Sequence, residues 1–236
     1  MQYIRRSEER GAANFGWLSS KHSFSFGNYY DPAHMGISAL RVINDDAVAP
    51  AAGFDTHGHK NMEIISYVLE GVIEHKDSTG NHYQIPAGDV QRMSAGRGVT
   101  HSEFNASKDK PLKFLQIWIQ PNEMDIEPEY EQRAIEQTSA LTTLVSPSGE
   151  GDALSIHQNA KISRLRLNAG ETYALTSSGE NAYLHVVSGG LKLEGGASAK
   201  GSLSEGDAIG GQIKQGEALE VAATPKGVEA LWFELP

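Results

Sequence analysis

The chain has 236 residues, and its 39% hydrophobic and 21% charged residues give the composition of an ordinary globular protein. Its formal net charge of −10 is opposite in sign to the basic surface of a nucleic-acid binder, so direct binding to nucleic acid is not expected. Cysteine is absent, which excludes disulfides and thiolate metal ligands. No apolar run approaches the roughly 20 residues of a membrane helix, and the polar start of the chain does not resemble a secretory signal. We therefore expect a cytoplasmic protein that does not contact membranes.

The first half of the chain predicts short strands separated by tight turns. An aromatic-rich segment, 1–35, includes an alternating stretch at 23–26 that is typical of a strand. Further strands are expected from residue 37 and at 63–70, 72–75, 83–85, 90–93 and 112–119. Turns or glycine-rich loops separate them at 77–81, 86–89 and 94–98. Strands at such short intervals indicate an antiparallel sandwich or barrel.

A break in this pattern predicts a second domain. Pro121, Pro128 and a polar stretch at 130–140 divide the chain into the expected domains 1–134 and 135–236. A second series of strands begins near residue 141, and its turn at 204–207 corresponds to the turn at 86–89, which indicates a weak internal repeat of one barrel type. The histidines of the second half, His157 and His185, have no partner at ligand spacing. We therefore expect the second domain to be a structural copy without metal.

Two short stretches each carry a pair of metal-binding residue types at positions i and i+2. These pairs are His57 with His59, and His101 with Glu103. Side chains two positions apart on a strand share a face. Two such strands would present three imidazoles and one carboxylate to a common interior, a set that suits a divalent transition metal and leaves positions open for a substrate. Either pair alone is a weak signal, but together they predict one metal site per chain.

The identity of the carboxylate ligand has an alternative. Glu63 follows His59 by four residues and shares its parity if one strand runs through both, so it is a second candidate ligand. A second carboxylate beside Glu103 would bring like charges together, and we therefore assign Glu63 to a position where it orients a metal-bound imidazole. The remaining histidines of the first half have no partner at ligand spacing and are interpreted as surface or loop residues: His22, His34, His75 and His82.

The motifs around the ligand pairs resemble those of the pirin family of the cupin superfamily. The similar segments are 57–63, 86–89 and 93–103, with further similarity at 23–32, 40–46 and 116–119. The resemblance is dense in the first half, loose in the second, and points to the bacterial pirin-like quercetin 2,3-dioxygenases. It implies an all-β fold of two jelly-roll cupin barrels packed face to face, of which only the N-terminal one binds metal. The ligands it implies are His57, His59, His101 and Glu103, whereas the wider cupin pattern would use the glutamate that matches Glu63.

The resemblance also implies an activity. It predicts a dioxygenase that opens flavonols such as quercetin with O₂ and releases carbon monoxide, with iron as the favoured metal and Cu, Ni, Co, Mn or Zn also compatible with the ligands. Glu103 is the expected proton acceptor. A flat polyphenol needs an apolar slot, and the candidate walls are Phe24, Phe26, Phe54, Met93 and Phe114. The alternatives are another enolic substrate, or a non-enzymatic iron sensor whose acidic surface binds a protein partner.

Overall fold

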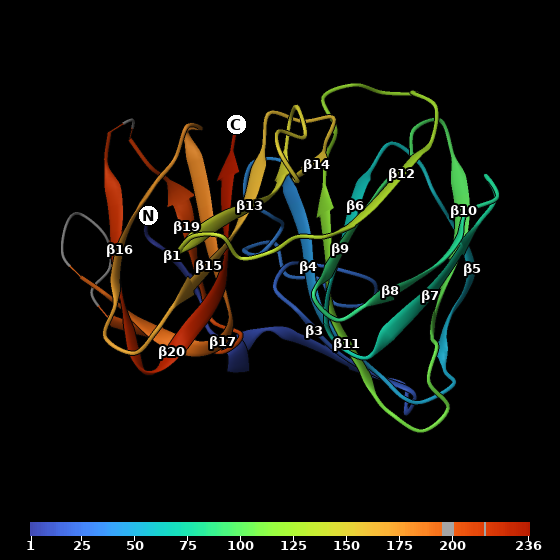
Figure 1. Cartoon of the computed structure of the whole chain (residues 1–236), viewed down its shortest axis with the longest axis horizontal. Coiled ribbons are helices and arrows are strands. Elements are labelled where there is room, and N and C mark those ends of the chain that lie inside the picture. The colour runs from blue at the N-terminus through green and yellow to red at the C-terminus, as the bar shows by residue number, and fades with distance from the viewer. Residues whose placement is uncertain (195–200, 215) are drawn as a thin grey trace. The chain divides into compact units, whose positions relative to one another are not determined.

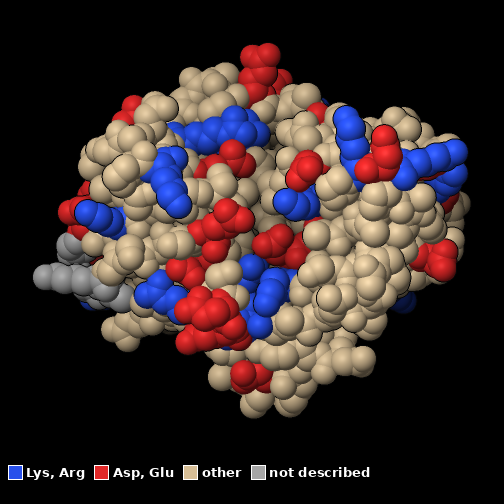
Figure 2. All heavy atoms as spheres, turned by 90° about the horizontal axis from the view of Figure 1, so that it is seen from below, with Lys and Arg blue, Asp and Glu red and all other residues tan. Residues whose placement is uncertain are grey.

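The computed structural model describes residues 1–194, 201–214 and 216–236 and consists almost entirely of antiparallel β-strands (Figure 1). A single 3-10 helix, η1 (Ser7–Glu9), is present in these residues. The all-β fold predicted from the strand and turn pattern is confirmed. Among the described residues, no helix has the length and apolar character that crossing a membrane requires. Acidic and basic side chains lie interspersed on the face drawn in Figure 2.

The chain folds into two compact units. The N-terminal unit contains residues 11–135 and 148–158, and the C-terminal unit contains residues 1–10, 136–147 and 159–236. The first ten residues belong to the second unit because β1 (Tyr3–Arg5) pairs with β19 (Ala208–Gln212), a pairing across the whole sequence that local patterns do not reveal. The simpler division of the sequence into 1–134 and 135–236 remains a prediction.

The N-terminal unit contains two sheets. The seven-stranded sheet has the order β12 (Glu129–Ala134), β9 (Asp89–Ser94), β6 (Glu63–Glu70), β11 (Leu112–Ile119), β4 (Leu40–Val48), β3 (Leu18–His22) and β2 (Gly11–Asn14). The four-stranded sheet has the order β5 (Gly53–His59), β10 (Val99–Asn105), β7 (Val72–Asp77) and β8 (His82–Pro86). Buried apolar residues of both sheets, such as Val68, Phe114, Ile73 and Ile85, form one core cluster. The two sheets therefore enclose a common interior, and the polar side chains on its wall form the candidate site.

The C-terminal unit has an apolar interior. Its strands form one sheet in the order β1, β19, β17 (Asn181–Leu193), β20 (Ala218–Leu235), β15 (Lys161–Leu167) and β13 (Leu141–Ser146), while β16 (Thr172–Thr176) pairs with β20 and β18 (Gly201–Ser204) pairs with β17. Its core cluster is built from leucine, isoleucine, valine and alanine side chains around the fully buried Trp232. His185 is also buried, and burial lowers its pKa to about 3, so it is a neutral core residue at neutral pH.

Candidate metal centre

Strands β5 and β10 bring three imidazoles together. They are antiparallel neighbours, and His101 lies directly opposite His57. A Cβ atom at Gly53 would collide with the backbone of Glu103 and Phe104, so glycine permits the close approach at the start of β5. The potential ligand atoms of His57, His59 and His101 all lie within 4.8 Å of one another, and Nε2 of His59 is 3.0 Å from Nε2 of His101. Three convergent imidazole nitrogens fit the binding of a transition metal ion.

The imidazoles are held in the form that binds a cation. Burial, reinforced by the neighbouring imidazoles, lowers the pKa of His59 and of His101 to about 3. Both rings are therefore neutral near pH 7 and keep a nitrogen lone pair. Nδ1 of His57 is 2.7 Å from the backbone oxygen of Asp55. Because a carbonyl oxygen only accepts, Nδ1 carries the proton and leaves Nε2 as the free donor atom for a metal.

Glu103 lies on the inner face of β10, two positions from His101, and is 3% exposed. Its carboxylate accepts hydrogen bonds from Nε2 of Gln116 at 2.9 Å and from Oγ of Ser66 at 3.3 Å. Burial raises its pKa, which makes it a stronger base than an exposed carboxylate. The group of mutually close ligand atoms consists of those of the three imidazoles. That Glu103 is a fourth metal ligand therefore stays a prediction. Gln116, which our interpretation of the sequence missed, holds this carboxylate in place.

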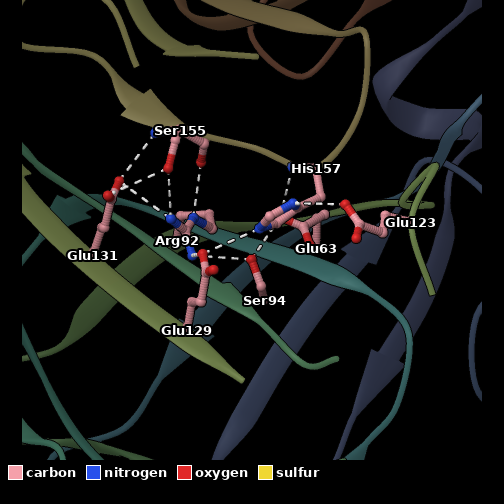
Figure 3. A network of polar contacts seen from close by, with 8 residues as sticks. All are labelled: Glu63, Arg92, Ser94, Glu123, Glu129, Glu131, Ser155 and His157. Carbon is pink, nitrogen blue, oxygen red and sulfur yellow. Dashed lines mark hydrogen bonds and ion pairs between the residues drawn. The ribbon is translucent and has the colours of Figure 1, made fainter. Parts of the chain in front are cut away.

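The structure places Glu63 in another polar network (Figure 3). Its Oε2 accepts hydrogen bonds from Oγ of Ser94 at 2.8 Å and from the backbone N–H of His157 at 3.4 Å. No hydrogen bond among the described residues joins Glu63 to the three imidazoles, so its expected orienting role has no supporting contact. The parity argument failed because no single strand connects His59 to Glu63: β5 ends at His59, Asn61 adopts a φ of 50°, and β6 begins at Glu63 in the other sheet.

Arg92 is the centre of this second network (Figure 3). Its guanidinium is buried and donates from Nε to the backbone oxygen of Ser155 and from Nη2 to Oγ of Ser155, both at 2.8 Å. It also forms ion pairs with Glu129 at 3.2 Å and Glu131 at 3.3 Å. A buried charge is stable only when its donors are paired in this way. The network therefore fixes the segment 148–158 to strands β9 and β12, and His157, which we expected to stand alone, joins it through Glu129 at 3.1 Å.

A cavity of about 730 Å³ opens beside the imidazoles within the N-terminal unit. His57, His59 and Glu103 line it together with an aromatic wall formed by Phe15, Trp17, Phe26, Tyr29, Phe54 and Trp118. The rings brace one another edge to face: the centroids of Phe26 and Trp118 are 5.3 Å apart, and those of Trp17 and Phe54 are 5.2 Å apart. Of the five residues proposed as walls, Phe26 and Phe54 line this cavity.

The other three expected wall residues lie elsewhere. Phe24 is 1% exposed and does not line the cavity. Phe114 packs in the core shared by the two sheets, and Met93 packs against Ile64 in a separate apolar cluster. None of the three lines this cavity, because apolar character alone does not distinguish the packed core of a barrel from the rim of its cavity.

Two histidines interpreted as surface or loop residues are buried. His22 is 5% exposed and lines the cavity. His75 is fully buried on β7, where its Nε2 lies 3.1 Å from Oδ2 of Asp77 and its Nδ1 lies 3.3 Å from Nε2 of Gln91. Asp77 at position i+2 was a signal for this pair, but we assigned that residue to a turn, whereas β7 continues through it.

Comparisons with known proteins agree with this geometry. Residues 4–119 match the family described as Pirin, and residues 143–235 match the family described as Quercetinase C-terminal cupin domain. Quercetin 2,3-dioxygenase of Escherichia coli (strain K12) is 45% identical, with 100% of this chain and 99% of the relative covered. A pirin-like protein of Caulobacter vibrioides is 41% identical over 80% of this chain and 83% of its own.

Solved structures extend the similarity to the fold. The crystal structure of YhhW from Escherichia coli has a TM-score of 0.93 at 43% identity and covers 99% of this chain and 97% of its own. The crystal structure of bacterial pirin YhhW in complex with nickel(II), also from Escherichia coli, has a TM-score of 0.91 at 43% identity and covers 99% and 98%. The predicted fold of two cupin domains is confirmed, and the chain belongs to the pirin family of the cupin superfamily.

Proposed function

We propose that this protein is a metal-dependent dioxygenase that opens flavonols such as quercetin with O₂ and releases carbon monoxide. The observation that carries the proposal is the convergence of three imidazoles, two of which line an aromatic-walled cavity together with the buried carboxyl group of Glu103. A volume of about 730 Å³ lies within the range of cavities that bind small organic molecules. The relatives named quercetin 2,3-dioxygenase support the same activity.

The donor set suits a single transition metal, held by His57, His59 and His101 with Glu103 as the proposed fourth ligand. We favour iron, although imidazole and carboxylate donors also accept Cu, Ni, Co, Mn or Zn, and a structure of a similar pirin contains nickel(II). When bound, the metal supplies positive charge that stabilises a deprotonated substrate hydroxyl group.

The residues of the chain itself would perform the remaining tasks. Glu103 takes the proton of the flavonol 3-hydroxyl group, a role that its raised pKa favours. Gln116 and Ser66 donate hydrogen bonds to the Glu103 carboxylate and so keep it aimed at the substrate. The aromatic wall takes the faces of the flavonol rings and displaces water from them. A cavity of this size beside convergent imidazoles favours chemistry on a small molecule over the alternative of a non-enzymatic sensor.

Reconstitution with defined metals tests the proposal. Metal-free protein is loaded separately with Fe, Ni, Co, Mn, Cu or Zn under anaerobic conditions, its metal content is measured, and quercetin and O₂ are added. We expect no more than one metal per chain at the site, and quercetin loss with release of carbon monoxide for at least one metal. His101→Ala should lose metal and turnover, whereas His82→Ala, at a histidine with an exposed side chain, is the matched control and should keep both. Failure of every metal to support carbon monoxide release, or faster turnover of other enolic compounds, would contradict the flavonol assignment.

A further inference from the structure

A row of polar side chains crosses the inner face of the seven-stranded sheet. The row occupies directly paired positions on five successive strands, β3, β4, β11, β6 and β9: His22, Asn44, Gln116, Ser66 and Gln91. Directly paired residues of an antiparallel sheet lie on the same face. Gln116 and Ser66, in the middle of the row, hold the Glu103 carboxylate. The row therefore leads from the proposed base toward β3 and β4, where the cavity continues.

Two buried oxygen atoms on β4 lack a hydrogen-bond partner in this part of the cavity. Asp46 lies two positions after Asn44 on β4, so both side chains share the inner face. Each residue is 3% exposed and lines the cavity. Oδ1 of Asn44 and Oδ1 of Asp46 are buried without a hydrogen-bond partner among the described residues. The Ser20 hydroxyl group lies opposite Asp46 on β3 and interacts with its carboxyl group, so Oδ1 is the acceptor of Asp46 that is left for a ligand. Because buried acceptors are normally satisfied, this part of the cavity is suited to a ligand that carries hydrogen-bond donors.

The surroundings of Asp46 disfavour an anionic ligand group. Burial, with a smaller effect of the neighbouring carboxylates of Glu103 and Asp45, raises the pKa of Asp46 to about 7. An anionic ligand group would be repelled here. The adjoining wall is aromatic and includes Trp17, Phe26 and Trp118. An aromatic ring that carries hydroxyl groups satisfies both features, since its face contacts the wall and its O–H groups reach the acceptors.

We propose that Asp46 and Asn44 form a hydrogen-bond-accepting subsite that binds substrate hydroxyl groups other than the one bound by the metal, and that this subsite selects polyhydroxylated flavonols. The inference rests on the proposed function and adds a specificity-determining pair to it. A flavonol without these hydroxyl groups would enter the same cavity but would leave the acceptors unpaired, and sites built to hydrogen-bond a hydroxyl group discriminate strongly against analogues that lack it.

Anaerobic binding to the metal-loaded protein tests the subsite without turnover. The two probes are quercetin and 3-hydroxyflavone, which shares the metal-binding hydroxyl group but lacks the others. Binding is followed by quenching of tryptophan fluorescence, because Trp17 and Trp118 line the cavity. The variants are Asp46→Leu, which removes the acceptors at similar size, and Asp46→Asn, which keeps one acceptor oxygen. Asp45→Leu is the matched control, since Asp45 neighbours Asp46 on β4 but does not line the cavity.

The deciding result is the ratio of the dissociation constants of quercetin and 3-hydroxyflavone, which shows whether the subsite recognises the additional hydroxyl groups. We expect Asp46→Leu to weaken quercetin binding by about 10–100-fold, the range for hydrogen bonds to a charged group, and to leave 3-hydroxyflavone binding within about twofold. Asp46→Asn should give a smaller loss in the same direction, and this variant decides the question if thermal unfolding shows that Asp46→Leu is not folded. Asp45→Leu should keep the wild-type ratio. An equal loss for both flavonols, or an unchanged ratio, would overturn the subsite alone. Absence of flavonol binding to the wild-type protein would overturn the proposed function together with the subsite.

Discussion

Replacing Asp46 by Asn should make the stability of the metal-free protein less dependent on pH. Burial raises the pKa of Asp46 from 3.8 to about 7, although the Ser20 hydroxyl group opposes the shift, and the Glu103 carboxylate adds to it. The folded state thus binds this proton more tightly than the unfolded chain does. The contribution of the protonated Asp46 to stability is fully present below about pH 4 and is lost as the pH rises through about 7. A shift of about three pKa units corresponds to roughly 4 kcal/mol as an upper limit of this loss.

The assay is urea unfolding of the wild-type protein, Asp46→Asn and Asp45→Asn from about pH 4 to pH 8. Glu63 and Glu103 also have raised pKa values. Both residues remain in every variant, so their contributions to the pH dependence of the unfolding free energy largely cancel when a variant is compared with wild type. Asp46→Asn should gain unfolding free energy relative to wild type as the pH rises, by up to roughly 4 kcal/mol. Asp45→Asn controls for the loss of one negative charge on the same strand. A difference between Asp46→Asn and wild type that stays constant with pH would refute the reasoning.

Three further predictions concern the metal centre and the Arg92 network. His101→Ala should lose metal binding while far-UV circular dichroism stays unchanged, because the barrel core does not depend on this ring; full metal occupancy would show that His101 is not a ligand. At matched metal occupancy, Glu103→Gln should lower turnover by about 10²–10⁴-fold, the usual contribution of a general base. Glu63→Gln should have a much smaller effect on turnover because the hydrogen bonds of Glu63 lie in another network. A larger loss of turnover for Glu63→Gln than for Glu103→Gln would assign the role of base to Glu63. Arg92→Met should lower the unfolding free energy by about 1.5–3 kcal/mol, the range for hydrogen bonds to charged groups, and leave metal affinity unchanged; a matching loss of metal would show that the two networks are coupled.

The metal centre was predictable because its signal is local. His57 and His59 share a strand face by their spacing alone, and His101 follows the same rule with Glu103. The structure needed only to bring two strands together, which the register of His101 opposite His57 does. Glu63 shows the limit of the same rule, since parity holds within one strand and the chain turns at Asn61 between two sheets.

The row of polar side chains on the seven-stranded sheet was not predictable from spacing. Asn44, Gln116 and Ser66 are far apart in the sequence, and they form a row only because β4, β11 and β6 are neighbours in one particular register. In the sequence, Gln116 and Ser66 are each a polar position within an apolar run, and Asn44 begins the polar stretch 44–46, so nothing in the sequence links the three residues. The contacts of Arg92 with Ser155 depend likewise on a long-range pairing between distant segments.

The stoichiometry of carbon monoxide release against metal content tests the central claim most directly. The protein is prepared at several metal occupancies, and quercetin consumed, O₂ consumed and carbon monoxide released are measured in the same sample. We predict one carbon monoxide for each quercetin and each O₂, with a rate that rises in proportion to occupancy up to one metal per chain and disappears in His101→Ala. Quercetin consumption without carbon monoxide, or a rate that is independent of the metal bound by His57, His59 and His101, would contradict the claim.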